Sequence, residues 1–119
     1  MSEFVEIKTA DLIGAALDWA VGYSVRWHDV ESRDAWARDW LRYYSPSTDG
    51  AYGGPLIEKY AVTLTPFAIS FDGDPSYWLA QPWDQRVMPV DGPTHLIAAC
   101  RAIVASVLGE TVSVPKELV

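Results

Sequence analysis

Hydrophobic residues recur at helical spacing in two stretches of the chain. The first begins after Thr9, which is a good N-cap, and ends at Gly22. Its apolar face consists of Leu12, Ile13, Ala16, Leu17, Ala20 and Val21. The second begins at Gly92-Pro93-Thr94 and ends at Gly109, with an apolar face of Leu96, Ile97, Cys100, Ile103, Val104, Val107 and Leu108. The pattern therefore predicts two main helices.

Some residues of these two helices lie off the apolar faces. Asp18 is either a solvated surface residue or a partner for a nearby loop, and Trp19 would cover the edge of the core. Three small residues, Ala98, Ala102 and Ala105, form a second face on the later helix. This face would allow close approach of another element. We expect that element to belong to the same chain, although the same helix of a partner subunit is an alternative.

Residues with strand propensity surround the helices. Glu3 to Lys8 alternates weakly and predicts a short first strand. Ala61 to Gln81 predicts a β-hairpin that turns at Asp72-Gly73-Asp74-Pro75, with Pro66 indicating an edge strand or a bulge. Arg86 to Val90 predicts a further short strand, and Thr111 to Val119 an extended tail anchored by Val112 and Val114.

The central part of the chain is rich in aromatic residues. Tyr23 to His28 alternates as a short strand would, and Arg33 to Tyr43 has helical character. Trp36, Trp40 and Tyr44 follow one another at a spacing of four residues, which favours a core-facing stripe. Stacking on a ligand is the alternative. Together the elements predict one compact α+β domain over residues 1–119, with two main helices packed on a small, mostly antiparallel β-sheet.

The densest turn chemistry lies in the stretch from Tyr44 to Glu58. Its glycines and prolines predict an ordered loop that opens into a short helix from Pro55 to about Lys59. Helix N-termini attract anions, so the loop is a candidate phosphate site. The alternative, which the sequence favours, is that the hydroxyl groups cap the backbone of the loop itself.

Composition excludes several classes of function. A net charge of -7 argues against general binding to DNA or RNA, which requires a basic surface. The single Cys suits a reducing cytoplasm, and neither a signal peptide nor a membrane-spanning stretch is visible.

The sequence contains no catalytic motif, cofactor motif or metal-ligand spacing. Cys100 lies on an apolar helix face, and His95 points in a different direction, so the two do not form a nucleophile–base pair. We therefore expect a binding protein without cofactor or metal, rather than an enzyme.

The candidate ligand is a small phosphorylated, nucleotide-type molecule. In this hypothesis hydroxyls and glycines of the loop hold phosphate, an aromatic ring covers the base, and an arginine adds positive charge. The candidate residues are Trp40, Arg42, Tyr44, Ser45, Ser47, Thr48, Asp49, Tyr52, Gly53, Gly54 and Arg101.

Three segments in order resemble one protein family. They are Leu12 to Val21, then Tyr44 to Asp49 with Gly53 to Glu58, then Gly92 to Arg101 with Val104-Ala-Ser106. Their order and spacing resemble the NinX-like phage proteins, and the similarity extends to the ending Val114 to Leu118. Arg33 to Tyr43 and Pro82 to Asp91 depart from the family pattern, and Cys100 stands where Met is common.

The resemblance implies an accessory phage protein made in the cytoplasm of the bacterial host, and brings no activity with it. Small phage proteins of this kind often sequester a host molecule or block a host protein. The leading hypothesis is therefore a homo-oligomer that binds, and by doing so sequesters, a nucleotide-type immune signal. Two alternatives are a protein-interaction module that inhibits a host or rival-phage protein, and a hydrolase of a nucleotide signal.

Overall fold

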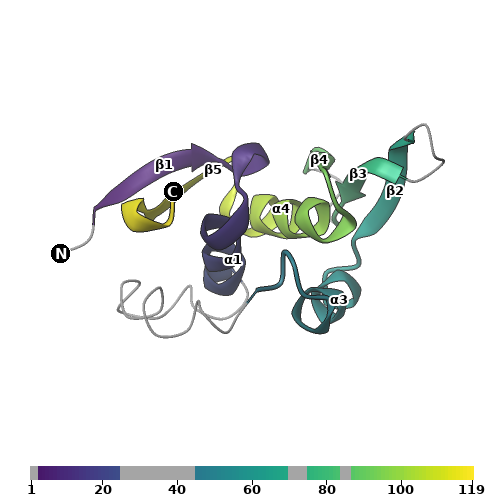
Figure 1. Ribbon diagram of the computed structural model, residues 1–119, viewed down its shortest axis with the longest axis horizontal. Helices are drawn as coiled ribbons and strands as arrows, with labels where there is room; N and C mark the ends of the chain where they lie inside the picture. Colours follow the sequence, from purple (N-terminus) through teal and green to yellow (C-terminus); the bar gives the residue numbers. More distant parts are fainter. Residues whose placement is uncertain (1–2, 25–44, 70–74, 84–86) are drawn as a thin grey trace.

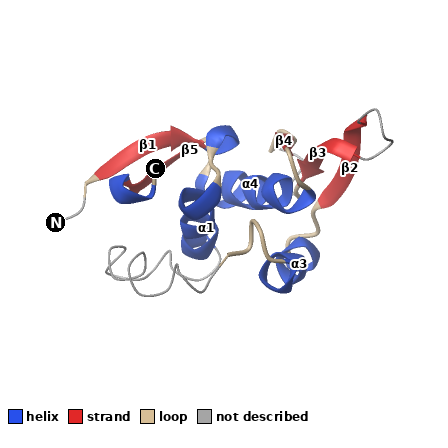
Figure 2. Ribbon diagram, in the orientation of Figure 1, coloured by secondary structure: helices blue, strands red, loops and turns tan. Residues whose placement is uncertain are grey.

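The computed structural model describes residues 3–24, 45–69, 75–83 and 87–119. Helix α4 (His95–Leu108) lies at the centre of this part of the chain, with a small antiparallel sheet toward each of its ends (Figures 1 and 2). One sheet pairs β1 (Phe4–Lys8) with β5 (Thr111–Pro115), and the other has the order β2-β3-β4. Helices α1 (Gly14–Gly22) and α3 (Gly50–Lys59) pack on α4, which gives an α+β fold as predicted.

The later predicted helix is confirmed, and its ends have the expected chemistry. The hydroxyl of Thr94 accepts a hydrogen bond from the backbone N–H of Ile97, which caps the first turn of α4. Gly109 ends the helix with a φ of 96°, a conformation that side chains disfavour. Nine consecutive residues of α4, from Leu96 to Val104, are buried, so the helix is the core element of the fold.

The hairpin prediction is also confirmed. Strands β2 (Thr63–Ile69) and β3 (Pro75–Gln81) pair antiparallel, and the register shifts after Pro66. The small-residue face of α4 packs against this hairpin, since Ala98 and Ala102 share a buried cluster with Val62 and Ala80. This face therefore contacts an element of the same chain, as expected.

The start of the first helix was predicted wrongly. Thr9 does not cap it: Thr9–Asp11 form a 3-10 turn, and α1 begins only at Gly14. The Thr9 hydroxyl instead donates a 2.7 Å hydrogen bond to the carbonyl oxygen of Gly109, and the Thr9 N–H donates to the carbonyl of Glu110. Thr9 is thus used to hold β1 against the end of α4.

Two residues near this helix also differ from the prediction. Ile13 is 56% exposed and does not belong to the apolar face, because it precedes the helix. Trp19 is fully buried rather than at the edge of the core, with its ring stacked on that of Tyr23 at a centroid distance of 5.3 Å. Tyr23 and Ser24 continue the helix instead of starting a strand, and the Ser24 hydroxyl donates to the carbonyl of Ala20.

The C-terminal segment is extended and anchored by Val112 and Val114, as predicted, and it also pairs with β1. Thr111–Pro115 form β5, in which Val112 and Val114 are buried while their neighbours Thr111 and Ser113 are exposed. This alternation seats the strand on the core beside β1, and a 3-10 turn follows at Lys116–Leu118. The short strand predicted at Arg86 to Val90 lies later, as β4 (Val90–Gly92).

The prediction of a helix starting at Pro55 was wrong by five residues. Helix α3 begins at Gly50, because the Asp49 carboxylate caps it by accepting a hydrogen bond from the N–H of Ala51. Pro55 lies inside the helix. Some predicted features lie outside the described residues. They are the stripe of Trp36, Trp40 and Tyr44, the predicted helix around it, and residues Asp72 to Asp74 of the predicted turn.

Candidate functional site

A buried hydrogen bond joins the loop that was predicted to hold phosphate, Ser45 to Asp49, to helix α1. The backbone N–H of Ser47 donates a 2.9 Å hydrogen bond to Oδ1 of Asp18. Burial raises the pKa of the Asp18 carboxyl group, and hydrogen bonding by Ser47 opposes part of that shift. Of the two readings of Asp18, the partner for a nearby loop is the one observed.

Other groups of the loop are satisfied within the chain. The N–H groups of Thr48 and Asp49 donate to the carbonyl oxygen of Ser45, and Asp49 caps α3. Gly53 is buried against Pro46 and Leu96, so that a Cβ atom there would lie 2.4 Å from the Pro46 oxygen. These contacts are those of a structural turn, and a carboxylate already lies at the N-terminus of α3.

The candidate ligand residues are only partly brought together. Ser45 to Gly54 form one continuous loop and helix start, in which Thr48 and Tyr52 are exposed. Ser47 is 2% exposed, and within the described residues its Oγ atom has no partner at good hydrogen-bond geometry. Arg101 donates to carbonyl groups outside the loop, and Trp40, Arg42 and Tyr44 lie outside the described residues.

Cys100 is a buried residue of the core, as predicted. Burial, and to a smaller extent the charge of Asp18, raise the pKa of its thiol to about 12. The thiol is therefore protonated at neutral pH, whereas nucleophilic cysteines require the thiolate. His95 instead contacts the ring of Trp78, at a centroid distance of 5.7 Å.

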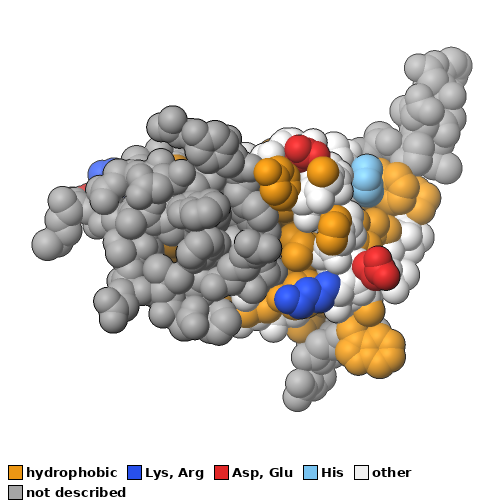
Figure 3. Space-filling view, turned by 90° about the horizontal axis from the view of Figure 1, so that it is seen from below, with side chains coloured by type: hydrophobic (Ala, Val, Ile, Leu, Met, Phe, Trp, Pro, Cys, Tyr) orange, Lys and Arg blue, Asp and Glu red, His pale blue; other side chains and the backbone are white. Residues whose placement is uncertain are grey.

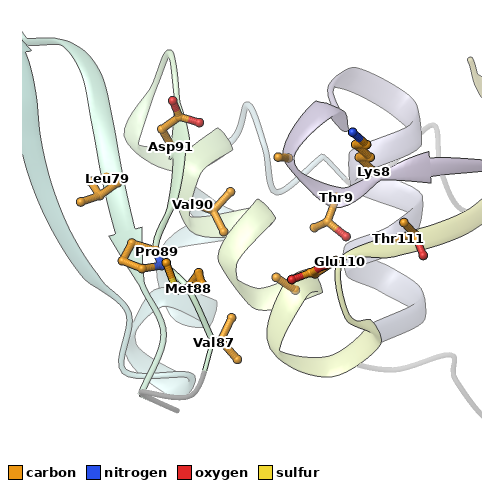
Figure 4. A pocket seen from close by; sticks show the side chains of 12 residues that line it. Lys8, Thr9, Leu79, Val87, Met88, Pro89, Val90, Asp91, Glu110 and Thr111 are labelled. Atoms are coloured by element: carbon orange, nitrogen blue, oxygen red, sulfur yellow. The ribbon is translucent and has the colours of Figure 1, made fainter.

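An open groove lies between the two sheets, over the C-terminal half of α4 (Figure 4). Its volume is about 790 Å³, within the range of small-molecule sites. One wall comes from the end of β1 and the start of β5, and the other from β3, β4 and the segment before β4. The lining residues are Lys8, Thr9, Ala10, Leu79, Val87, Met88, Pro89, Val90, Asp91, Ala105, Glu110 and Thr111.

The two walls of the groove differ in chemistry. One wall is polar and consists of Lys8, Thr9, Glu110 and Thr111. The hydroxyl of Thr9 already donates its hydrogen bond to the carbonyl oxygen of Gly109. The opposite wall is mostly apolar, with Val87, Met88, Pro89 and Val90 below the carboxylate of Asp91 (Figure 4). An apolar surface facing a few polar groups is the usual composition of a ligand site.

No local sequence pattern indicates this groove. Its residues come from three separated segments, 8–10, 79–91 and 105–111, which form no motif. The first and third of these segments meet because β5 pairs with β1, whereas the sequence predicted only an extended tail anchored by Val112 and Val114. Predicting this groove would have required the pairing of the strand predicted at Glu3 to Lys8 with the C-terminal segment that contains Val112 and Val114.

A second hollow of about 600 Å³ lies between the end of α3, the end of β3 and the end of α4. Trp83, 78% exposed, and Val107, 43% exposed, stand at its rim beside Lys59. Seen from below, hydrophobic side chains are spread over the described part of the surface around α3 (Figure 3). Exposed aromatic residues of this kind are enriched at protein interfaces.

Among the residues that the structure describes, no helix is both long and apolar enough to cross a membrane. Nor do three His, Cys, Asp or Glu residues gather in that part of the chain as a metal site would require.

The described residues form a small α+β fold with an open groove of mixed polar and apolar lining. Comparison with family models gives a match to Bacteriophage P22, NinX over residues 8–107, and the chain belongs to that phage family. All three segments on which the resemblance rested lie within the matched residues, as do Arg101 and most of the groove. A search among curated proteins gives no match.

Proposed function

We propose that this phage protein binds a small nucleotide-type ligand without transforming it, and that the groove between the two sheets is the binding site. The groove carries the proposal because it combines three surfaces that a nucleotide needs within about 790 Å³. A base requires an apolar face, a ribose requires acceptors for its hydroxyls, and a phosphate requires a donor with positive charge.

Each requirement has a matching group in the groove. The side chains of Val87, Met88 and Pro89 offer the apolar face (Figure 4). The exposed carboxylates of Asp91 and Glu110 are acceptors of the kind that bind ribose hydroxyls. Lys8 on the polar wall supplies the cation, and the two carboxylates would repel a phosphate group placed beside them.

Sequestration is the biological role that fits binding without turnover in a phage protein. In this role the ligand is a nucleotide signal of the host, and its removal by binding would silence the signal. A homo-oligomer would multiply the number of sites per particle, and that state is part of the proposal. The loop Ser45 to Gly54 is a rival site for the same ligand, with Thr48 as its exposed hydroxyl.

Native mass spectrometry tests the proposal directly. The protein is measured as purified and then with a panel of linear and cyclic nucleotides, which reports oligomeric state and bound mass together. We expect a discrete added mass that is recovered chemically unchanged after denaturation. A bare protein across the whole panel would contradict the proposal, and an altered ligand would favour the hydrolase.

Titration calorimetry of variants then locates the site. Lys8→Ala should weaken binding about tenfold or more, the usual result of losing a charge-assisted hydrogen bond. Lys59→Ala is the matched control, because it removes the same charge from an exposed lysine outside the groove. If Thr48→Ala weakened binding while Lys8→Ala did not, the ligand would belong to the loop.

A second candidate function is inhibition of a host or rival-phage protein. The observation that favours it is Trp83, which is 78% exposed at the rim of the second hollow. Pull-down from host lysate with the parent protein and with Trp83→Ala tests this function. A partner captured by the parent and lost by the variant is expected, and identical profiles with both would count against it.

A further inference from the structure

Arg101 is a buried arginine on α4 whose hydrogen bonds join the two sides of the groove. Its Nε donates a 2.8 Å hydrogen bond to the carbonyl oxygen of Leu12, and its Nη1 a 2.9 Å hydrogen bond to that of Asp91. Only 8% of the residue is exposed. The side chain does not line the groove. The sequence had suggested another role for Arg101, as an arginine that adds positive charge to a ligand site at the loop.

The first acceptor belongs to the polar wall. Leu12 follows the 3-10 turn Thr9–Asp11, and its N–H donates to the carbonyl of Thr9, so these residues form one hydrogen-bonded unit. Thr9 and Ala10 of this unit line the groove. The unit is held to the end of α4 by Thr9 and to the middle of α4 by Arg101.

The second acceptor belongs to the apolar wall. Asp91 lies in β4, between Val90, which lines the groove, and Gly92. Gly92 packs directly on α4, since a Cβ atom there would lie 2.7 Å from the backbone nitrogen of Ala98. Strand β4 pairs with β3 at only three positions, and the bond from Arg101 adds a direct link from its middle residue to α4.

A guanidinium group suits this position better than any other cation. Its planar fork offers several N–H donors in fixed directions, so one side chain can bond two carbonyl oxygens at once. Asp91 and Asp11 lie near enough to favour its charged form, which opposes the lowering of its pKa by burial. A lysine has a single nitrogen and would reach both carbonyls only with poor geometry.

We propose that Arg101 is a positioning residue that sets the distance between the two walls of the groove, and thereby the affinity of the ligand that the groove holds. The structural half of this inference concerns the walls alone. The affinity half rests on the proposed function of the groove. The two halves are tested separately, so that failure of one does not conceal the other.

Hydrogen exchange without ligand tests the structural half. In Arg101→Met, which keeps a long apolar stem, the amides of Thr9 to Ile13 and of Val90 to Gly92 should exchange at least about tenfold faster, in both segments together. Arg101→Lys should restore slow exchange in at most one segment. Ser106→Ala is the matched control on the same helix, since the Ser106 hydroxyl donates only to the carbonyl of Ile103.

The outcomes decide the inference without ambiguity. Faster exchange in both segments with Arg101→Met, and in neither with Ser106→Ala, supports it. Unchanged exchange, or a change in one segment only, overturns it. If Arg101→Met fails to fold, Arg101→Lys takes its place, and slow exchange in both segments of that variant would overturn the inference.

Titration with adenosine monophosphate and with inorganic phosphate tests the affinity half. We expect Arg101→Lys to weaken nucleotide binding by about fivefold or more, while Ser106→Ala leaves it unchanged. Equal affinity of parent and Arg101→Lys would overturn this half. If the parent binds neither probe, the titration is repeated with the panel nucleotide that the parent does bind. If it binds none of the panel, the proposed function fails, and the exchange experiment alone decides whether Arg101 positions the walls.

Discussion

The backbone N–H of Ser47 donates its hydrogen bond to Oδ1 of Asp18 at 2.9 Å, and both residues are buried. The contact joins residues 29 apart in the chain and is the point at which the loop before α3 docks on α1. An unpaired N–H in such a place is costly, because water cannot replace the lost acceptor. The loop is therefore held by an interaction that a single substitution removes.

Asp18→Ala should lower the free energy of unfolding by about 1–3 kcal/mol, the usual cost of a buried polar group without a partner. Asp18→Asn should cost less, because its side-chain oxygen can still accept from the N–H of Ser47. Urea unfolding at neutral pH, followed by circular dichroism, measures both. Equal losses for the two variants would show that the charge of Asp18 matters more than its role as acceptor.

The raised pKa of Asp18 predicts how stability varies with pH. Since the folded-state pKa lies above the ordinary value of 3.8, the folded protein binds the proton more tightly than the unfolded chain. The contribution of Asp18 is then fully present below pH 3.8 and is lost as the pH rises through the folded-state pKa. The free energy of unfolding of the parent, minus that of Asp18→Asn, should therefore fall as the pH rises from 3.8 through the folded-state pKa.

Chemical unfolding of the two proteins across a pH series measures this difference. Subtracting the variant removes the contributions of the other carboxylates, which titrate in the same range. If the free energy of unfolding of the parent, relative to Asp18→Asn, instead rises with pH, hydrogen bonding by Ser47 affects the pKa of Asp18 more than burial does.

Gly53 and Gly54 are neighbours with opposite expectations. A Cβ atom on Gly53 would lie 2.4 Å from the Pro46 oxygen and 2.8 Å from Cδ2 of Leu96, so Gly53→Ala should destabilise by about 1–3 kcal/mol. A Cβ atom on Gly54 meets nothing within 4 Å, and in a helix alanine is favoured over glycine. Gly54→Ala should therefore stabilise by about 0.5–1 kcal/mol. Thermal and urea unfolding of the pair check both signs, and a stabilised Gly53→Ala would mean that the loop does not pack on α4 as described.

The thiol of Cys100 should be almost unreactive in the folded protein. With a pKa of about 12 in place of the ordinary 9.0, the thiolate fraction at pH 8 is about a thousandfold lower. Burial also blocks access of the reagent. Labelling by a chromogenic disulfide should be at least about a hundredfold slower in buffer than in concentrated urea. Rapid labelling of the folded protein would exclude the buried position of this residue.

The elements that could be predicted from the sequence are those whose signal is local. Helix α4 has a cap at Thr94, a continuous apolar face and a terminating glycine at Gly109, and its ends were predicted correctly. The β2–β3 hairpin likewise carries its own turn residues and a proline at the register shift. In such segments neighbouring residues alone are enough to favour the observed structure.

The errors occur where a residue is used by a distant part of the chain. Thr9 has the chemistry of an N-cap, but its hydroxyl bonds Gly109, one hundred residues away. Val112 and Val114 were predicted correctly as anchors, but their pairing with β1 was missed because that strand lies at the opposite end of the sequence. The groove depends on both of these long-range contacts, so it could not be predicted from local pattern.

Gly92 offers the sharpest test of how β4 is held on the core. A Cβ atom there would lie 2.7 Å from the backbone nitrogen and 2.9 Å from the Cα of Ala98, and helix backbone cannot yield as a side chain does. Gly92→Ala should destabilise by about 1–3 kcal/mol and push β4 away from α4.

Gly50→Ala is the matched control, because nothing lies within 4 Å of the added atom. Urea unfolding measures the stability of both variants, and hydrogen exchange at Val90 and Asp91 reports the strand. If Gly92→Ala is as stable as the control and its β4 amides remain protected, the close contact between β4 and α4 is absent in solution.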